Sequence, residues 1–461
     1  MHTTPPQQTE TECVPLVVRW RRLRAAYRLA NLATHHVLGF TVKLALLLYF
    51  VFALLFLFLR YAILPNIDYY KGGIERAASA ACGNRVQIAR VYASWNGLRP
   101  NLFLGDVTLH DAAGRKVLGL PSVSATLAWW SVLAADVRFH SLEIIRPELD
   151  VRRAADGKLY VAGVGFDPDR GGADGQGADW LLAQREIVIR EGRINWSDEL
   201  RGAPPLPLDK LSLVLRNRWR EHQFALRATP PATLAAPLDV RASFVHPVFS
   251  KRISDATMWK GELFVDLRHA DLAAWKTYLD YPFALASGNG ALRAWITLDH
   301  AKLAGFTADV GLANVSARLG PELPPLELAH VSGRVAAREE FPLHVQDGLP
   351  TFGARGHEIS LTDFSLQTRD GLRLAPTTLS EHYRAPANGQ PERVHFKARL
   401  LDLETLAALA AQLPLRPEQR KLLADLAPRG RLQDFSAEWQ GSLPTLSAYR
   451  VKGRVEGLGL N

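Results

Sequence analysis

The longest apolar run of the chain extends from Val37 to Leu59, and Lys43 is the only charged residue within it. A helix of this length spans about 34 Å at 1.5 Å per residue, which is enough to cross a bilayer. The run continues into Arg60 without the small residues of a cleavage site, so we expect an uncleaved transmembrane signal anchor over residues 37–64. The anchor residues are expected to be Leu44, Leu47, Phe50, Leu54, Phe56 and Leu59.

After the anchor, apolar and polar residues alternate with a period of two over most of the chain. This alternation predicts antiparallel strands with one apolar and one solvated face, because parallel strands favour continuous apolar runs. The fold class is therefore expected to be mainly β with a few helices. The apolar sets of the clearest strands include Leu238, Val240, Phe244, Leu292, Ile296, Leu298, Phe306, Val310, Val394 and Phe396. The pattern alone leaves open whether a second sheet covers their face or the face stays open as a groove.

Helical periodicity interrupts the strands at three places, Leu127–Val137, Ala270–Asp280 and Leu401–Pro428, and prolines break the last one. A Gly/Asp-rich linker is expected at residues 166–179. These features divide the exported part into a β-rich domain at 65–165 and its continuation at 180–461. The chain stops directly after a strand-like segment, which leads us to expect a longer protein.

The positive charge of the chain is concentrated beside its most apolar stretch. The net charge is +9, and five arginines precede the anchor: Arg19, Arg21, Arg22, Arg24 and Arg28. Cytoplasmic flanks are enriched in Lys and Arg, so residues 1–36 are expected to be a basic cytoplasmic segment. A nucleic-acid-binding domain would carry its charge on a folded face instead, so no nucleic-acid partner is expected.

Signatures of catalysis are absent from the sequence. It has no G-x-S-x-G elbow, no Walker loop, no H-E-x-x-H and no dinucleotide fingerprint after a strand. The aspartates of the 166–179 segment lack the register of a calcium loop, and the two cysteines form no ligand cluster. We therefore expect no catalytic residues, no metal site and no cofactor. A carboxylate pair assembled from distant positions would escape this reasoning, so a hydrolase stays open.

Several segments resemble, in order, the N-terminal part of the YhdP branch of the AsmA-like proteins of Gram-negative bacteria. They are the anchor ending near Arg60, followed by Val91–Leu133, Leu142–Val164, Trp180–Leu200 and Leu213–Phe244. The resemblance implies an inner-membrane protein, N-terminus cytoplasmic and bulk periplasmic, with a long curved antiparallel sheet forming an apolar groove. It implies bridge-like transfer of phospholipid between inner and outer membrane, which maintains the outer-membrane barrier.

The partners expected from this resemblance are phospholipid acyl chains and the inner membrane, together with outer-membrane or other envelope proteins. The ten apolar strand residues named above are then the expected groove lining. The alternative is a periplasmic scaffold or assembly factor for envelope proteins. A lipid conduit predicts an apolar face left uncovered along consecutive strands, whereas a scaffold predicts closed domains with an exterior patch or an open edge strand.

Overall fold

The chain contains two compact units, Met1–Tyr69 and Tyr70–Asn461. The computed structural model describes residues 16–82, 85–110, 114, 116–129, 131, 138–161, 164–166, 175–250, 252–281, 283–300, 302–340, 353, 355–387, 389–415, 417–442 and 445–460.

The first unit is helical, and its elements are α1 (Leu16–Phe58), η1 (Leu59–Ile63) and η2, which runs from Leu64 to Tyr70. Among the described residues, one helical stretch is long and apolar enough to cross a membrane. Of the anchor residues, Leu44, Leu47, Phe50 and Leu54 are exposed. A helix that is apolar and exposed all round is suited to a lipid environment, which supports the predicted single-pass anchor.

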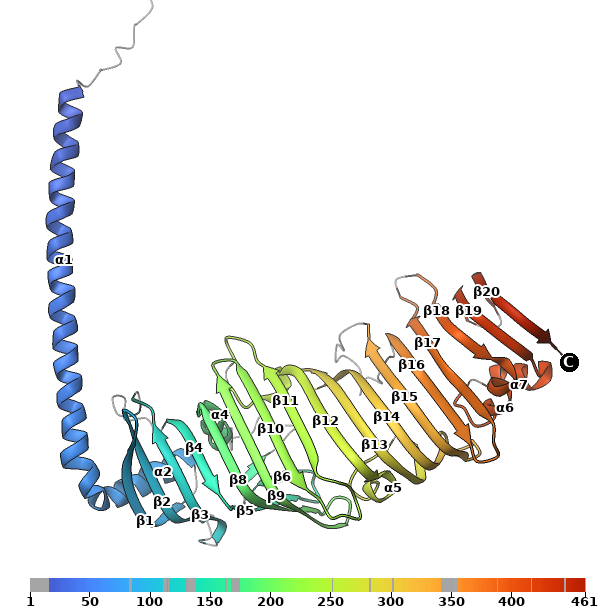
Figure 1. The fold of residues 1–461 in the computed structure, drawn as a ribbon, viewed down its shortest axis with the longest axis horizontal. Helices are drawn as coiled ribbons and strands as arrows, with labels where there is room; N and C mark the ends of the chain where they lie inside the picture. The colour runs from blue at the N-terminus through green and yellow to red at the C-terminus, as the bar shows by residue number, and fades with distance from the viewer. Residues whose placement is uncertain are drawn as a thin grey trace, which may run out of the picture. The chain divides into compact units, whose positions relative to one another are not determined.

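The second unit is built on one sheet, to which all twenty described strands belong. In Figure 1 the strands from β8 onward follow one another side by side along the sheet. The first strands are β1 (Arg85–Asn96), β2 (Arg99–His110), β3 (Lys116–Leu127), β4 (Phe139–Ile145), β5 (Glu148–Arg153), β6 (Leu159–Val161) and β7 (Val164–Phe166). The middle strands are β8 (Glu186–Asp198), β9 (Ala203–Arg218), β10 (Glu221–Thr229), β11 (Leu238–Val245), β12 (Lys260–Asp271), β13 (Ala284–Asp299) and β14 (Lys302–Arg318). The last strands are β15 (Leu326–Glu339), β16 (Gly356–Thr368), β17 (Arg373–Arg384), β18 (Arg393–Asp402), β19 (Arg429–Gln440) and β20 (Ala448–Gly459).

The helices of this unit are few and short. They are α2 (Lys71–Cys82), α4 (Gly175–Ala183), η3 (Ala256–Met258), α5 (Leu272–Trp275), α6 (Leu403–Leu409) and α7 (Pro417–Leu426). Asp271 and Asp402 end their strands and cap α5 and α6, because each carboxylate accepts a backbone N–H three residues later. The predicted helices at 270–280 and 401–428 are thus confirmed in part, and most of 127–137 lies outside the described residues. The mainly β fold class is confirmed.

Strand pairing is antiparallel between consecutive strands from β1 to β4 and from β8 to β20. The exception is that β4 and β5 both pair in parallel with β8. The segment 166–179 lies inside this crossover, and its last residues begin α4 at Gly175. The sheet is therefore continuous across the Gly/Asp-rich segment.

Non-glycine residues with positive φ recur inside the strands at positions where the pairing register shifts, which marks β-bulges: Glu191, Lys210, His269, Asn314, Asp363 and Asp434. The alternation of the strand shifts by one residue at each bulge. In β14, Leu312 and Val315 pack in the same apolar cluster although they are three positions apart, because Asn314 with φ of 52° takes up the extra position. Bulges bend a strand and increase its twist, so a repeated bulge bends the whole sheet.

Helix α2 covers the free edge of the first strand, β1. Glu75 Oε1 accepts a hydrogen bond from the backbone N–H of Ile88 at 2.8 Å, and Ser79 Oγ accepts one from Val86 at 2.8 Å. Lys71 Nζ donates to the backbone carbonyl of Ala89 at 3.1 Å. The three side chains are four residues apart and therefore lie along one helix face. They hydrogen-bond to backbone N–H and carbonyl groups of β1, which an edge strand otherwise leaves free to pair with another chain.

Replacing Glu75 and Ser79 together with alanine is expected to open this edge. Loss of each hydrogen bond to a partly buried N–H costs about 1–3 kcal/mol, so exchange of the Val86 and Ile88 amides should accelerate at least about tenfold. Hydrogen–deuterium exchange of the full chain in detergent measures this directly. Arg76→Ala, on the solvent side of the same helix, is the matched control. Unchanged exchange at both amides in the double variant would contradict edge capping by α2.

Candidate functional site

An unbroken apolar row crosses the sheet. Each residue of the row is directly opposite the next one on the neighbouring strand, so all their side chains lie on one face. The row consists of Val91, Leu104, Val123, Ile144, Ile189, Leu213, Leu226, Val240, Val265, Ala294, Ala308, Val335, Leu361, Leu379, Ala398 and Phe435. We call the face that carries this row the apolar face.

All ten apolar residues selected from the sequence lie on the apolar face, because each is an even number of positions from the row within an uninterrupted part of its strand. Cross-strand pairs join several of them: Leu292 is opposite Val310, and Ile296 is opposite Phe306. Leu238 and Val394 are buried, and the other eight are half-buried. The structure thus brings these ten residues together on one surface.

Cover over the apolar face changes along the sheet. From β1 to β8 the row alternates between the buried Val91, Val123 and Ile189 and the half-buried Leu104 and Ile144. There α2 packs on β1 and also contacts α4. From Leu213 on β9 to Leu379 on β17, every residue of the row is half-buried instead. The face is therefore more fully covered from β1 to β8 than along the strands from β9 to β17.

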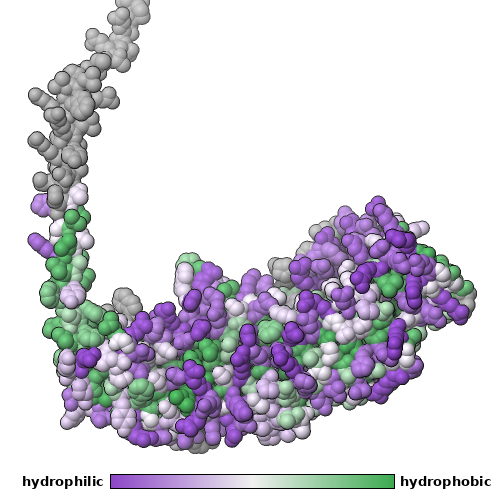
Figure 2. Space-filling model, viewed as in Figure 1, coloured by the Kyte–Doolittle hydropathy of each residue, from purple (hydrophilic) through white to green (hydrophobic). Residues whose placement is uncertain are grey.

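One margin of the apolar face is packed more tightly than its centre. Near α5 a cluster of buried residues contains Leu206, Leu234 and Trp275, and near α6 a second contains Leu285, Val315 and Leu409. The short helices thus close the strand ends at which they occur. In Figure 2 the apolar residues form a band along the sheet between more polar regions.

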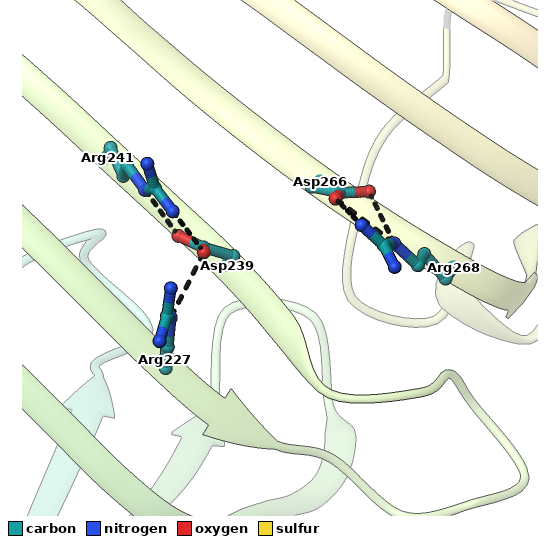
Figure 3. Close-up of polar contacts among 5 residues, drawn as sticks. All are labelled: Arg227, Asp239, Arg241, Asp266 and Arg268. Carbon is teal, nitrogen blue, oxygen red and sulfur yellow. Dashed lines mark hydrogen bonds and ion pairs between the residues drawn. The ribbon is translucent and has the colours of Figure 1, made fainter.

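Ion pairs cover the opposite face, as Figure 3 shows for strands β10 to β12. Asp239 accepts from Arg241 at 2.8 Å and from Arg227 at 3.1 Å, and Arg268 is 3.0 Å from Asp266. Hydrogen bonds from Arg241 first and then Arg227 hold the pKa of Asp239 below its usual value. Exposed pairs of this kind contribute little to stability, but they keep this face hydrated. The two faces are therefore chemically distinct.

A buried polar cluster at the ends of β8 to β11 was not found from the sequence. It consists of Gln184, Asn217, His222 and His246, all buried. His222 Nδ1 lies 2.7 Å from Asn217 Oδ1, and Asn217 Nδ2 donates to the Gln184 carbonyl at 2.7 Å. Burial, and then the neighbouring His246, lower the pKa of His222 to about 4. The ring of Trp259 stacks on His222 at 4.8 Å between centroids.

Hollows on the described surface are open to solvent and have mixed polar and apolar linings. One of about 500 Å³ is lined by residues that include His330 and Asp402, but Asp402 caps α6 through a 3.0 Å bond to the Thr405 amide. No group of three or more His, Cys, Asp or Glu side chains in the described part of the chain has a geometry that could hold a metal ion. The extended apolar face is the feature that stands out as a candidate site.

Comparison with protein families gives one match. The family model described as YhdP protein matches residues 27–461, which confirms the resemblance found in the sequence. No curated protein matches the chain.

Proposed function

Since the chain belongs to the YhdP family, we propose that it carries phospholipid along the apolar face of its sheet between the inner and the outer membrane. Family membership points to a role of the AsmA-like kind in the cell envelope. Our proposal is more specific than this role: the protein transfers lipid and thereby maintains outer-membrane integrity.

The observation that supports this proposal is the unbroken apolar row with half-buried side chains from Leu213 to Leu379. Burial of an acyl methylene is worth about 0.8 kcal/mol, so a face of this kind can hold lipid tails without specific contacts to the headgroup. Because the row has no polar interruption, a tail that slides from one strand to the next meets no barrier of desolvation. A headgroup can stay in water beside the polar margin.

The proposed topology follows from the anchor. We place α1 in the inner membrane with its N-terminus in the cytoplasm, because the five arginines from Arg19 to Arg28 precede the apolar span. The sheet then lies in the periplasm. The proposed partners are lipid acyl chains, the inner membrane, and outer-membrane or other envelope proteins.

The proposal involves no chemical reaction, so the protein would act without catalytic residues or cofactors. The scaffold alternative predicts closed domains, in which the centre of the apolar face is fully covered. Half-buried side chains over successive strands favour the conduit instead.

Photocrosslinking in cells tests lipid occupancy. Benzoylphenylalanine at Ile296 in the full chain is expected to capture phospholipid labelled with radioactive phosphate, because this residue lies on the apolar face between Leu263 and Phe306. Its neighbour Thr297 is exposed on the opposite face and is the matched control. We expect about tenfold more label at Ile296 than at Thr297. Label no higher at Val240, Ile296 and Val310 than at Thr297 would overturn the proposal.

A further inference from the structure

Two neighbouring turns lie at the same end of strands β9 to β12. The first is the tight turn Trp219–Arg220 between β9 and β10, and the second lies between β11 and β12 and is described for residues 246–250 and 252–259. They are held side by side because the backbone N–H of His246 donates to the Arg220 carbonyl at 3.2 Å. We call them the paired turns.

The paired turns carry the two most exposed large apolar side chains that are described in the second unit. Phe249 is 94% exposed and Trp219 is 81% exposed. Val245 and Val248 are exposed beside them. Single exposed apolar residues are ordinary, but aromatic rings gathered on adjacent turns mark a contact surface.

The backbone conformation at Trp219 indicates that its side chain does not serve to stabilise the fold. Trp219 has a φ of 48°, in the left-handed region that glycine takes without strain and that a bulky residue rarely adopts. The exposed ring contributes little packing to offset this strain. Strained residues that the fold does not need occur mainly at functional positions, so the indole is expected to contact something outside the chain.

Arginines surround the exposed rings. Arg218 and Arg220 flank Trp219, and neither has an ion-pair partner among the described residues. Arg252 is exposed in the second turn. The nearby acids hydrogen-bond to uncharged amides rather than to these arginines: Glu221 accepts from Gln223 at 2.6 Å and Asp255 accepts from the Thr257 amide at 3.1 Å. The paired turns therefore present aromatic rings beside Arg218 and Arg220, neither of which forms an ion pair among the described residues.

The base of the paired turns is rigid. His222 bridges to Asn217 and stacks on both His246 and Trp259. Trp259 Nε1 also donates to the Ile253 carbonyl at 2.8 Å, within the second turn. A surface held in this way loses little conformational entropy when it binds a partner.

We propose that the paired turns dock on the surface of an anionic phospholipid bilayer. Trp219 and Phe249 enter the boundary between headgroups and acyl chains, while Arg218 and Arg220 bind lipid phosphates. Aromatic rings flanked by Lys or Arg are the side chains that favour this interface, and each cation near an anionic surface contributes about 1 kcal/mol. Docking also brings the apolar face at the ends of β10 and β11 next to lipid.

Environment-sensitive fluorescence tests the docking. The full chain, with Cys13 and Cys82 replaced by serine, is labelled with nitrobenzoxadiazole at Phe249→Cys and held in nanodiscs. The nanodiscs contain either equal parts of phosphatidylglycerol and phosphatidylcholine, or phosphatidylcholine alone. We expect emission to rise about threefold and shift to the blue with the anionic lipid, and brominated lipid to quench it. Leu279→Cys, exposed at the opposite ends of the strands, is the matched label site and should not respond.

Variants separate docking from folding and from lipid carriage. Trp219→Gly relieves the positive-φ strain, so it should melt at the same or a higher temperature while losing most of the fluorescence response. Arg218→Gln with Arg220→Gln should reduce the response to the anionic lipid at least about fivefold. Photocrosslinking of lipid at Ile296 is a separate readout. Loss of that crosslink with a normal fluorescence response would count against lipid carriage and not against docking. No change in the Phe249→Cys probe with either lipid, or a full response in Trp219→Gly, would overturn the docking proposal.

Discussion

Replacing Ile296 with aspartate is expected to interrupt lipid movement at the middle of the sheet. Ile296 lies on β13 with Leu263 and Phe306 opposite it on the two neighbouring strands. A carboxylate there keeps its hydration shell and forces about four methylenes of a passing tail off the apolar face. At about 0.8 kcal/mol each, this raises the barrier by about 3 kcal/mol, or about a hundredfold in rate.

Photocrosslinking on either side of the block measures this effect. Probes at Leu226 on β10 and at Phe396 on β18 lie on the apolar face on opposite sides of β13. In Ile296→Asp we expect labelled lipid to persist at one probe and to fall by about a hundredfold at the other, and the side that loses label reports the direction of movement. Thr297→Asp, on the opposite face of the same strand, is the control. Equal label at both probes, in a variant that melts like the parent, would show that lipid does not pass along the face.

Acidification is expected to destabilise the second unit through His222. Burial lowers the pKa of His222 to about 4 in the folded state, whereas an unfolded histidine has a pKa near 6.5. The unfolded chain therefore binds the additional proton between these values, and stability falls as pH decreases from about 6.5 to about 4. The shift corresponds to a loss of about 3 kcal/mol in the free energy of unfolding, at about 1.4 kcal/mol per pKa unit.

Denaturation of the full chain in detergent between pH 7.5 and pH 4 measures the slope. His222→Gln has no titrating ring, so its stability should depend less on pH than that of the parent, whatever its stability at neutral pH. His330 is exposed, and His330→Gln is the matched control that should keep the parental slope. A parental slope in His222→Gln would show that this ring does not carry the pH dependence.

The sequence predicted those features that depend on local pattern. The 23-residue apolar run indicated the anchor, because length and hydrophobicity alone decide whether a helix can cross a bilayer. Alternation identified the strands and placed Val240, Ile296 and Phe396 on the same kind of face, because successive side chains of a strand point to opposite sides. These residues were found without knowledge of any strand's partner.

Bulges show where simple alternation stops being sufficient. In β9, both Leu208 and Leu211 pack in one apolar cluster, although strict alternation would put them on opposite faces. The cause is Lys210, whose φ of 50° takes up one extra residue. The local signal was present, since two consecutive polar residues, Asp209 and Lys210, separate the two leucines, but a turn gives the same signal.

By itself the sequence determined the apolar helix long enough to cross a membrane, the β class and the apolar content of each strand, because these follow from near-neighbour spacing. Only the tertiary structure decided the register that aligns those strands into one uninterrupted row. It also decided the parallel return of β4 and β5 to β8, and the burial of His222 against Trp259. Each of these depends on contacts between residues distant in the chain, whose relative positions are set by packing and pairing rather than by local preference.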